Sequence, residues 1–432
     1  MGSVDFDLPS IGLLFGLFFG LMVARVPISF ALAISALVTA WHTGASLGGI
    51  FNKMALGLSD EGLLAIPFFI LAGEIMSAGS ISQRLIALAS ALVGRFRGGL
   101  ASVNILASMF FGGVSGSSVA DTSSIGSIMI PMMKKRGYDA EFAVGVTITG
   151  STQGIIIPPS HNAIIYANTW GYPQIGLLFI AGVVPGVMVG LALMLVAWMV
   201  ALHRGYPREA GVSLRQLPGV MLTSLPALLT AVIIVGGILS GWFTANESAV
   251  VAAVYALLLS VLGYRDLPLR RLGGVLVRAM RIIGMVMFLI GSASAFGWMM
   301  TRLRVPAMLT GWLLSVTTDP VLVKLLILAL LLALGCVMDM APLILICAPI
   351  LKPAVESIGM HPAHFGIVML LALGIGLVTP PVGSTLFVGC AIGGTTMERV
   401  TRTLWPFYLA MLAVLLAVTF VPDLALWLPG RM

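Results

Sequence analysis

The stretch Gly154-Ile-Ile-Ile-Pro158-Pro159-Ser160 has a counterpart 222 residues later, in Gly376-Leu-Val-Thr379-Pro380-Pro381-Val382. Both place the pattern Gly-x-x-x-Pro-Pro inside a long apolar run. Because proline removes a backbone donor and crowds the preceding turn, each run should be a helix that is broken in its middle. Corresponding broken helices in two halves of a chain are typical of secondary transporters, in which they indicate the substrate site.

The composition indicates a membrane protein with many spans. Of the 432 residues, 59% are hydrophobic and only 9% are charged, and the mean hydropathy is +1.09. Apolar runs of helical length recur, whereas the alternating strands of a membrane barrel do not, so we predict an all-α polytopic fold. The net charge of +7 comes from residues in short loops between apolar runs. Nucleic acid is therefore not an expected partner.

Four apolar segments are too short to cross a bilayer comfortably, because a crossing needs about 20 residues. They form two close pairs, 100–115 with 118–133 and 321–337 with 340–353, each joined by small or turn-prone residues. We predict that each pair is a re-entrant helical hairpin. About ten spanning helices account for the other apolar segments.

The distribution of basic residues predicts the orientation of these hairpins, since lysine and arginine collect on the cytoplasmic side. Arg95 and Arg97 precede the first hairpin and three basic residues at 134–136 follow it, so this hairpin should enter from the cytoplasm. The basic loops at 204–217 and 265–281 also fall inside. The second hairpin then enters from the opposite side, and both termini are periplasmic.

The chain is expected to divide into two repeats of inverted topology. The first, 1–203, contains scaffold helices 11–90, hairpin 100–133, broken helix 141–170 and helix 174–203. A cytoplasmic basic linker, 204–217, leads to the second, 218–432, with scaffold helices 218–300, hairpin 321–353, broken helix 362–396 and helix 405–425. Asp121 and Pro131 correspond to Asp339 and Pro349 at a constant offset of 218 residues, which supports the division.

The tip of the first hairpin is rich in glycine and hydroxyl residues at a depth where leucine and valine would be expected. Backbone breaks exposed to lipid are not tolerated, so the tip should line a cavity. Free amides at the start of the returning helix could bind a carboxylate. We therefore predict substrate contacts from Ser115, Gly116, Ser117, Ser118 and Asp121. The alternative is close helix packing through small residues.

Two aspartates and several hydroxyls near the breaks are further candidates. An ionised carboxylate in a membrane needs a partner, so Asp121 and Asp339 either contact an ion or substrate or cap the returning helices. Most membrane Ser and Thr residues bond back to their own helix. The candidates that lie closest to the breaks, and that we add to the predicted substrate site, are Ser151, Ser160, Thr379 and Ser384. Glu74 and Glu247 are expected to be paired structurally or to lie at the membrane interface, rather than to couple transport to an ion.

Several motifs together resemble the large membrane subunit of tripartite ATP-independent periplasmic (TRAP) transporters. They are Gly113-Val-Ser-Gly-Ser-Ser-Val-Ala-Asp121, Pro131-Met-Met-Lys-Lys-Arg-Gly-Tyr138, Ile157-Pro-Pro-Ser160, Met338-Asp-Met-Ala-Pro342 and Thr379-Pro-Pro-Val-Gly383. The resemblance covers nearly the whole chain. It implies a sodium-driven importer of organic acids, not an enzyme, in the bacterial inner membrane, with an elevator motion of a transport domain against a scaffold.

The same resemblance implies partners and ion sites. The partners are a soluble periplasmic substrate-binding protein and a small four-helix membrane subunit, which we expect on a separate chain because no extra four-helix unit precedes the first repeat. Sodium, the implied coupling ion, would lie between each hairpin tip and the adjacent broken helix. The implied sodium-site residues are Ser115, Ser118, Gly154, Pro158, Asp339, Gly376, Thr379 and Gly383.

Two other functions fit parts of the sequence. A stand-alone sodium/dicarboxylate or citrate carrier would have a related architecture and need no partners. A rhomboid-like intramembrane protease would use Ser115 of Gly113-Val-Ser115-Gly116 as nucleophile and His161 as base. The protease hypothesis leaves the second hairpin and the repeat unexplained.

Overall fold

The computed structural model describes residues 7–59, 61–207, 217–317 and 319–431. Every regular element in these ranges is helical, which confirms the all-α prediction. Seven of the described helices are long and apolar enough to cross a membrane, fewer than the ten or so predicted. The counts differ because helices such as α1 (Leu8–Val23) and α2 (Ile28–His42) are shorter than the roughly 20 residues that a crossing needs.

An inner group of helices contains the two predicted hairpins and the two predicted broken helices. In the first half of the chain its members are α6 (Gly99–Ser115), α7 (Ser118–Lys135), α8 (Ala140–Ser151), η2 (Thr152–Ile155), α9 (His161–Trp170) and α10 (Ile175–His203). In the second half they are α15 (Pro320–Gly335), α16 (Met340–Ser357), α17 (Pro362–Gly376), α18 (Ser384–Gly393) and α19 (Met397–Phe420). The same order of elements therefore occurs twice. The short elements α20 (Asp423–Leu426) and η4 (Pro429–Arg431) end the described chain.

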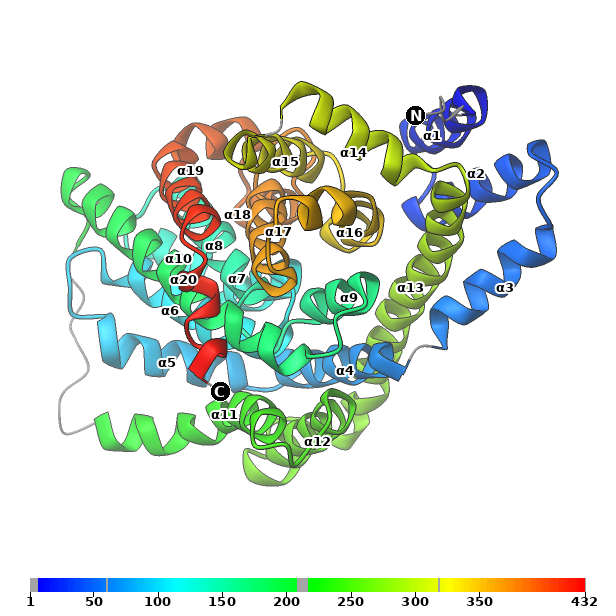
Figure 1. Ribbon diagram of the computed structural model, residues 1–432. Coiled ribbons are helices and arrows are strands. Elements are labelled where there is room, and N and C mark those ends of the chain that lie inside the picture. The colour runs from blue at the N-terminus through cyan, green and yellow to red at the C-terminus, as the bar shows by residue number, and fades with distance from the viewer. Residues whose placement is uncertain (1–6, 60, 208–216, 318, 432) are drawn as a thin grey trace.

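An outer group of helices covers the inner group on two sides (Figure 1). Besides α1 and α2 it consists of α3 (Leu47–Leu58), η1 (Glu61–Leu64), α4 (Ala65–Ala78), α5 (Ile81–Val93), α11 (Leu217–Leu239), α12 (Ala245–Leu258), the π-helical turn η3 (Leu259–Gly263), α13 (Leu269–Arg302) and α14 (Val305–Val316). The long helix α13 packs against α2, α3 and α4, and α12 packs against α4 and α11.

The two groups meet along a few helices. Hairpin helix α6 packs on α5 and α4, and hairpin helix α16 packs on α13 and α14. Within the inner group the halves interlock, because α7 of the first hairpin packs on α18 and α16 of the second hairpin packs on α9. The ends of the broken helices are thus held by the hairpin of the other half.

Several boundaries differ from the sequence prediction for local reasons. The apolar run 62–90 is two helices, because Gly79 and Ser80 interrupt it. Helix α3 lies within the predicted range of scaffold helices, 11–90, and α13 begins at Leu269 although the basic residues at 270–281 made that part resemble a loop. Residues 208–216 of the predicted linker and residues 1–6 at the N-terminus lie outside the described residues. The division into inverted repeats stays a prediction.

Glu247 has the structural role expected of it. Its carboxylate accepts a hydrogen bond from the backbone N–H of Thr244 at 2.8 Å, and its own N–H donates to the Thr244 hydroxyl at 3.3 Å. This reciprocal pair is a capping box, which satisfies two free amides at the start of α12.

Candidate transport site

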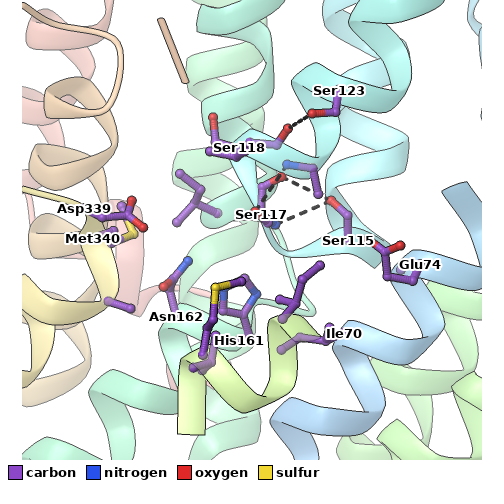
Figure 2. Close-up of a pocket in the computed structure, with 18 of the residues that line it drawn as sticks. Ile70, Glu74, Ser115, Ser117, Ser118, Ser123, His161, Asn162, Asp339 and Met340 are labelled. Carbon is purple, nitrogen blue, oxygen red and sulfur yellow. Dashed lines mark hydrogen bonds between the residues drawn. The ribbon is translucent and has the colours of Figure 1, made fainter. Parts of the chain in front are cut away.

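A cavity of about 510 Å³ lies between the inner and outer groups of helices. Both hairpin tips and the start of α9 form its inner wall, whereas α4 and α13 form its outer wall. Figure 2 shows Asp339 and Met340 on one side, Ser115, Ser117 and Ser118 on the other, and His161 with Asn162 between them. Both hairpin tips and the start of one broken-helix segment therefore meet at one cavity.

The tip of the first hairpin is a two-residue turn, Gly116-Ser117, between α6 and α7. Ser117 caps α7 by accepting a hydrogen bond from the N–H of Ala120 at 3.4 Å. Gly116 has φ +62°, and a Cβ there would lie 3.0 Å from His161 Nδ1. The position therefore requires glycine both for its left-handed backbone and for the space that His161 occupies.

The tip of the second hairpin places Asp339 before the first residue of α16. The carboxylate of Asp339 is exposed, makes no capping bond with its own helix, and accepts a hydrogen bond from Ser384 Oγ at 3.3 Å. Ser384 is the first residue of α18. The structure thus brings together two predicted site residues from the second hairpin and the second broken helix.

A buried cluster of hydroxyls joins the first hairpin to both broken helices. Ser118 and Ser151 form a 2.8 Å hydrogen bond, Thr122 donates to Ser151 at 2.8 Å, and Thr385 donates to Ser118 at 3.0 Å. Ser151 also donates to the carbonyl of Ile148. Ser151 and Thr385 stand behind the cavity wall, and they position Ser118, which lines it.

Each broken helix packs so closely against a hairpin helix that, at one glycine pair, no side chain fits between the two backbones. A Cβ on Gly112 would lie 2.2 Å from the Cα of Gly154, and a Cβ on Gly376 would lie 2.4 Å from the carbonyl carbon of Gly335. The chain is unwound after each contact, at 156–160 and 377–383, where the Pro158-Pro159 and Pro380-Pro381 bonds are cis. Carbonyls at such helix ends lack intrahelical partners and are available to a cation.

The predicted substrate residues divide into two groups. Ser115, Ser117 and Ser118 line the cavity, whereas the described lining residues do not include Gly116, Asp121, Ser151, Ser160, Thr379 or Ser384. Asp339, a residue of the implied sodium site, also lines it. Ser160 caps α9 by accepting from the N–H of Ala163 at 3.3 Å, and Thr379 donates back to the carbonyl of Ile375 at 2.7 Å.

Asp121 lies inside the first hairpin. It is 0% exposed, and neither carboxylate oxygen has a hydrogen-bond partner among the described residues. The N-cap of its helix is Ser117, so Asp121 does not hold the capping position that was its alternative role. Asp339 does occupy an N-cap position, but without the capping bond.

Several cavity residues were not predicted as site residues, among them His161, Asn162 and Glu74. His161 and Asn162 enter at the start of α9, and Glu74 enters from α4. The position of His161 and Asn162 directly after the break was the available signal. Glu74 accepts from Arg278 Nε at 3.3 Å, which agrees with its expected structural pairing. No local signal indicated that α4 would border the cavity.

Three helices begin at the cavity. The first residues of α7, α9 and α16 line it, and the start of a helix carries about half a positive charge from its free N–H groups. Among the described lining residues none is a lysine or an arginine, and two are acids, Glu74 and Asp339. Arg278 pairs with Glu74, so the helix starts and hydroxyls are the donors that the described lining offers.

The fold is shared with a solved membrane transporter. A solved structure with the same fold is the YdaH transporter of Alcanivorax borkumensis, which aligns with a TM-score of 0.62 over 88% of each chain at 13% sequence identity.

The family is shown by sequence. Residues 15–424 match the model of the tripartite ATP-independent periplasmic transporter, DctM component, and the chain belongs to this family. It is 41% identical to the uncharacterized protein YgiK of Salmonella typhimurium over 96% of both chains. It is 36% identical to the 2,3-diketo-L-gulonate TRAP transporter large permease protein YiaN of Escherichia coli, over 95% of this chain and 96% of YiaN.

The match confirms the resemblance inferred from the motifs. The chain is a multi-pass membrane protein of a transporter family rather than an enzyme. The protease hypothesis for Ser115 and His161 is therefore set aside.

Proposed function

We propose that the chain imports an organic acid across the bacterial inner membrane together with sodium. A periplasmic binding protein delivers the acid, a small membrane subunit on a separate chain completes the assembly, and both termini of this chain face the periplasm. The name of YiaN, which refers to the acid 2,3-diketo-L-gulonate, supports the substrate class.

The observation that carries the proposal is the convergence of three helix starts on one cavity. The amides of α7, α9 and α16 and the hydroxyls of Ser115, Ser117 and Ser118 can bind a carboxylate without a cationic side chain. Binding through dipoles leaves no permanent counter-charge, so the acid can leave the site again after each transport cycle.

Sodium would be held where each broken helix touches a hairpin. Sodium is a hard cation that prefers carbonyl, hydroxyl and carboxylate oxygens. Gly154 and Pro158 with Ser115 and Ser118 offer such oxygens in the first half. Asp339, Gly376, Thr379 and Gly383 offer them in the second. The close glycine contacts support this location, because they bring the carbonyl ends of two helices together.

The two walls of the cavity support an elevator motion. Hairpins and broken helices form the inner wall as one interlocked group, while α4 and α13 form the outer wall. The hydroxyls of Ser77 on α4 and Ser124 on α7 are in contact across this boundary. The inner group would carry the acid and sodium past the outer group.

Uptake by reconstituted vesicles tests the proposal. The chain, its small membrane subunit and the binding protein are combined with labelled organic acids under an inward sodium gradient. Accumulation that requires both the gradient and the binding protein is the expected result. Uptake indifferent to sodium would refute the coupling, and uptake by this chain alone would instead indicate a stand-alone carrier.

A further inference from the structure

Two lysines, one in each half of the inner helix group, make similar contacts with the end of a short helix. Lys134 Nζ donates a hydrogen bond to the carbonyl of Gly393 at 2.9 Å. Lys352 Nζ donates to the carbonyl of Trp170 at 2.8 Å. The lysines are 218 positions apart, whereas the helices α7 and α16 that carry them begin 222 residues apart, so Lys352 lies about one turn further from the end of its helix than Lys134 does.

Both carbonyls end a short helix that follows a proline break. Gly393 is the last residue of α18 and Trp170 is the last residue of α9, and each helix has 10 residues. The last carbonyls of a helix have no intrahelical partner and carry partial negative charge. A lysine ammonium is therefore well suited to this position. The ammonium of Lys352 also lies 5.5 Å from the centre of the Trp170 ring.

Each contact crosses between the halves of the chain. Lys134 belongs to the first hairpin and holds a helix of the second half, whereas Lys352 belongs to the second hairpin and holds a helix of the first half. Helices α7 and α18 also meet at their other ends, where Ser118 of α7 accepts a hydrogen bond from Thr385 of α18 at 3.0 Å. Helix α18 is thus attached to α7 both near the cavity and at its far end.

A ten-residue helix needs such attachment. Isolated helices shorter than about 12–15 residues are marginally stable in water, and a proline break leaves α9 and α18 without a continuous helix before them. At its other end α9 presents His161 and Asn162 to the cavity, and α18 presents Ser384 to Asp339. Displacement of the far end of either helix would therefore move groups at the site.

We propose that Lys134 and Lys352 are positioning residues that hold α18 and α9, respectively, and so set the affinity of the cavity from its two sides. The effect on affinity rests on the proposed transport function. The effect of the lysines on the two helices does not depend on that function, and it can be measured without any substrate.

Amide hydrogen exchange of the assembly of this chain with its small membrane subunit, in lipid nanodiscs, tests the helix effect. In Lys134→Met, amides in the last turn of α18 should exchange about 2- to 5-fold faster, the range that a cation at a helix C-terminus provides, and α9 should be unchanged. In Lys352→Met, α9 should change and α18 should not. Exchange that is unchanged in both variants, or that rises equally in both helices, overturns the proposal.

Matched variants separate this role from loss of charge. Lys135→Met removes the neighbouring cation, which is exposed and makes no hydrogen bond or ion pair with the described residues of α18. Lys324→Met removes a cation from the second hairpin. Neither should alter exchange in α9 or α18. Lys134→Arg and Lys352→Arg should restore most of the protection. If the methionine variants do not assemble, Lys134→Gln and Lys352→Gln test the same crossed pattern.

Uptake kinetics test the affinity effect separately. The methionine variants should raise the apparent KM for the acid or for sodium about 2- to 5-fold, with rescue by arginine. An unchanged KM together with the crossed exchange pattern would restrict the lysines to a structural role and overturn the positioning claim. Absence of sodium-driven uptake by the wild-type assembly would instead refute the proposed function.

Discussion

Substitution of Gly376 by alanine should weaken sodium coupling by separating the second broken helix from its hairpin. A Cβ at this position would lie 2.4, 2.5 and 2.7 Å from the carbonyl carbon, Cα and carbonyl oxygen of Gly335. All three atoms are backbone, so no side-chain rotation can relieve the overlap. Restoring an ordinary contact of about 3.5 Å requires a shift of about 1 Å between α17 and α15.

The magnitude follows from the cost of overpacking. Extra atoms in a packed interior cost about 1–3 kcal/mol, which corresponds to about 5- to 150-fold in an equilibrium constant. Because the strained contact borders the proposed site formed by Asp339, Thr379 and Gly383, we expect the sodium concentration for half-maximal uptake to rise by about this factor.

The assay is sodium-dependent uptake by vesicles that contain the assembly. Gly374→Ala is the matched control, because it adds a Cβ to the same helix with only ordinary contacts, the nearest at 3.9 Å. Its sodium dependence should equal that of the wild type. If Gly376→Ala assembles normally and also keeps the wild-type sodium dependence, the proposed sodium site beside Gly376 is refuted.

Three further substitutions probe other parts of the account. Gly116→Ala should lower the melting temperature of the assembly and slow uptake, since a left-handed residue other than glycine costs about 1–2 kcal/mol and the new Cβ crowds His161; unchanged stability would contradict this. Asp339→Asn should raise the sodium requirement about 10-fold or more, because a hydrogen bond or ion contact to a charged group contributes about 1.5–3 kcal/mol; an unchanged requirement would exclude this carboxylate as a sodium ligand. Burial raises the pKa of Tyr206, whose hydroxyl donates to Asp139 at 2.6 Å. The contribution of the neutral phenol to the stability of the folded protein should therefore be present below pH about 10 and be lost as the pH rises further. Thermal unfolding from pH 8 to 11 should show a smaller loss of stability in Tyr206→Phe than in the wild type.

Much of the site could be predicted because its signals are local. Paired prolines in an apolar run break a helix in any context, and both runs are broken where the prolines lie. Glycines and serines at membrane depth likewise indicated the hairpin tips, and Ser115, Ser117 and Ser118 do line a cavity.

The rest depended on packing between distant segments. The outer wall comes from α4 and α13, which are about 200 residues apart in sequence and carry no motif that links them. The sequence pattern pairs Asp121 with Asp339 at an offset of 218 residues, but α7 and α16 begin 222 residues apart, so Asp121 is the fourth residue of α7 whereas Asp339 precedes the first residue of α16. Asp121 is therefore buried within its hairpin, whereas Asp339 is exposed beside the cavity.

The central claim is that the inner helices move past the outer ones during transport. A disulfide across that boundary tests it most directly. The hydroxyls of Ser77 and Ser124 are in contact between α4 and α7, so Ser77→Cys with Ser124→Cys, in a chain whose native cysteines are replaced, should cross-link on oxidation. Oxidation should abolish uptake and reduction should restore it, while neither single variant should respond. Full uptake by the cross-linked assembly would contradict the account.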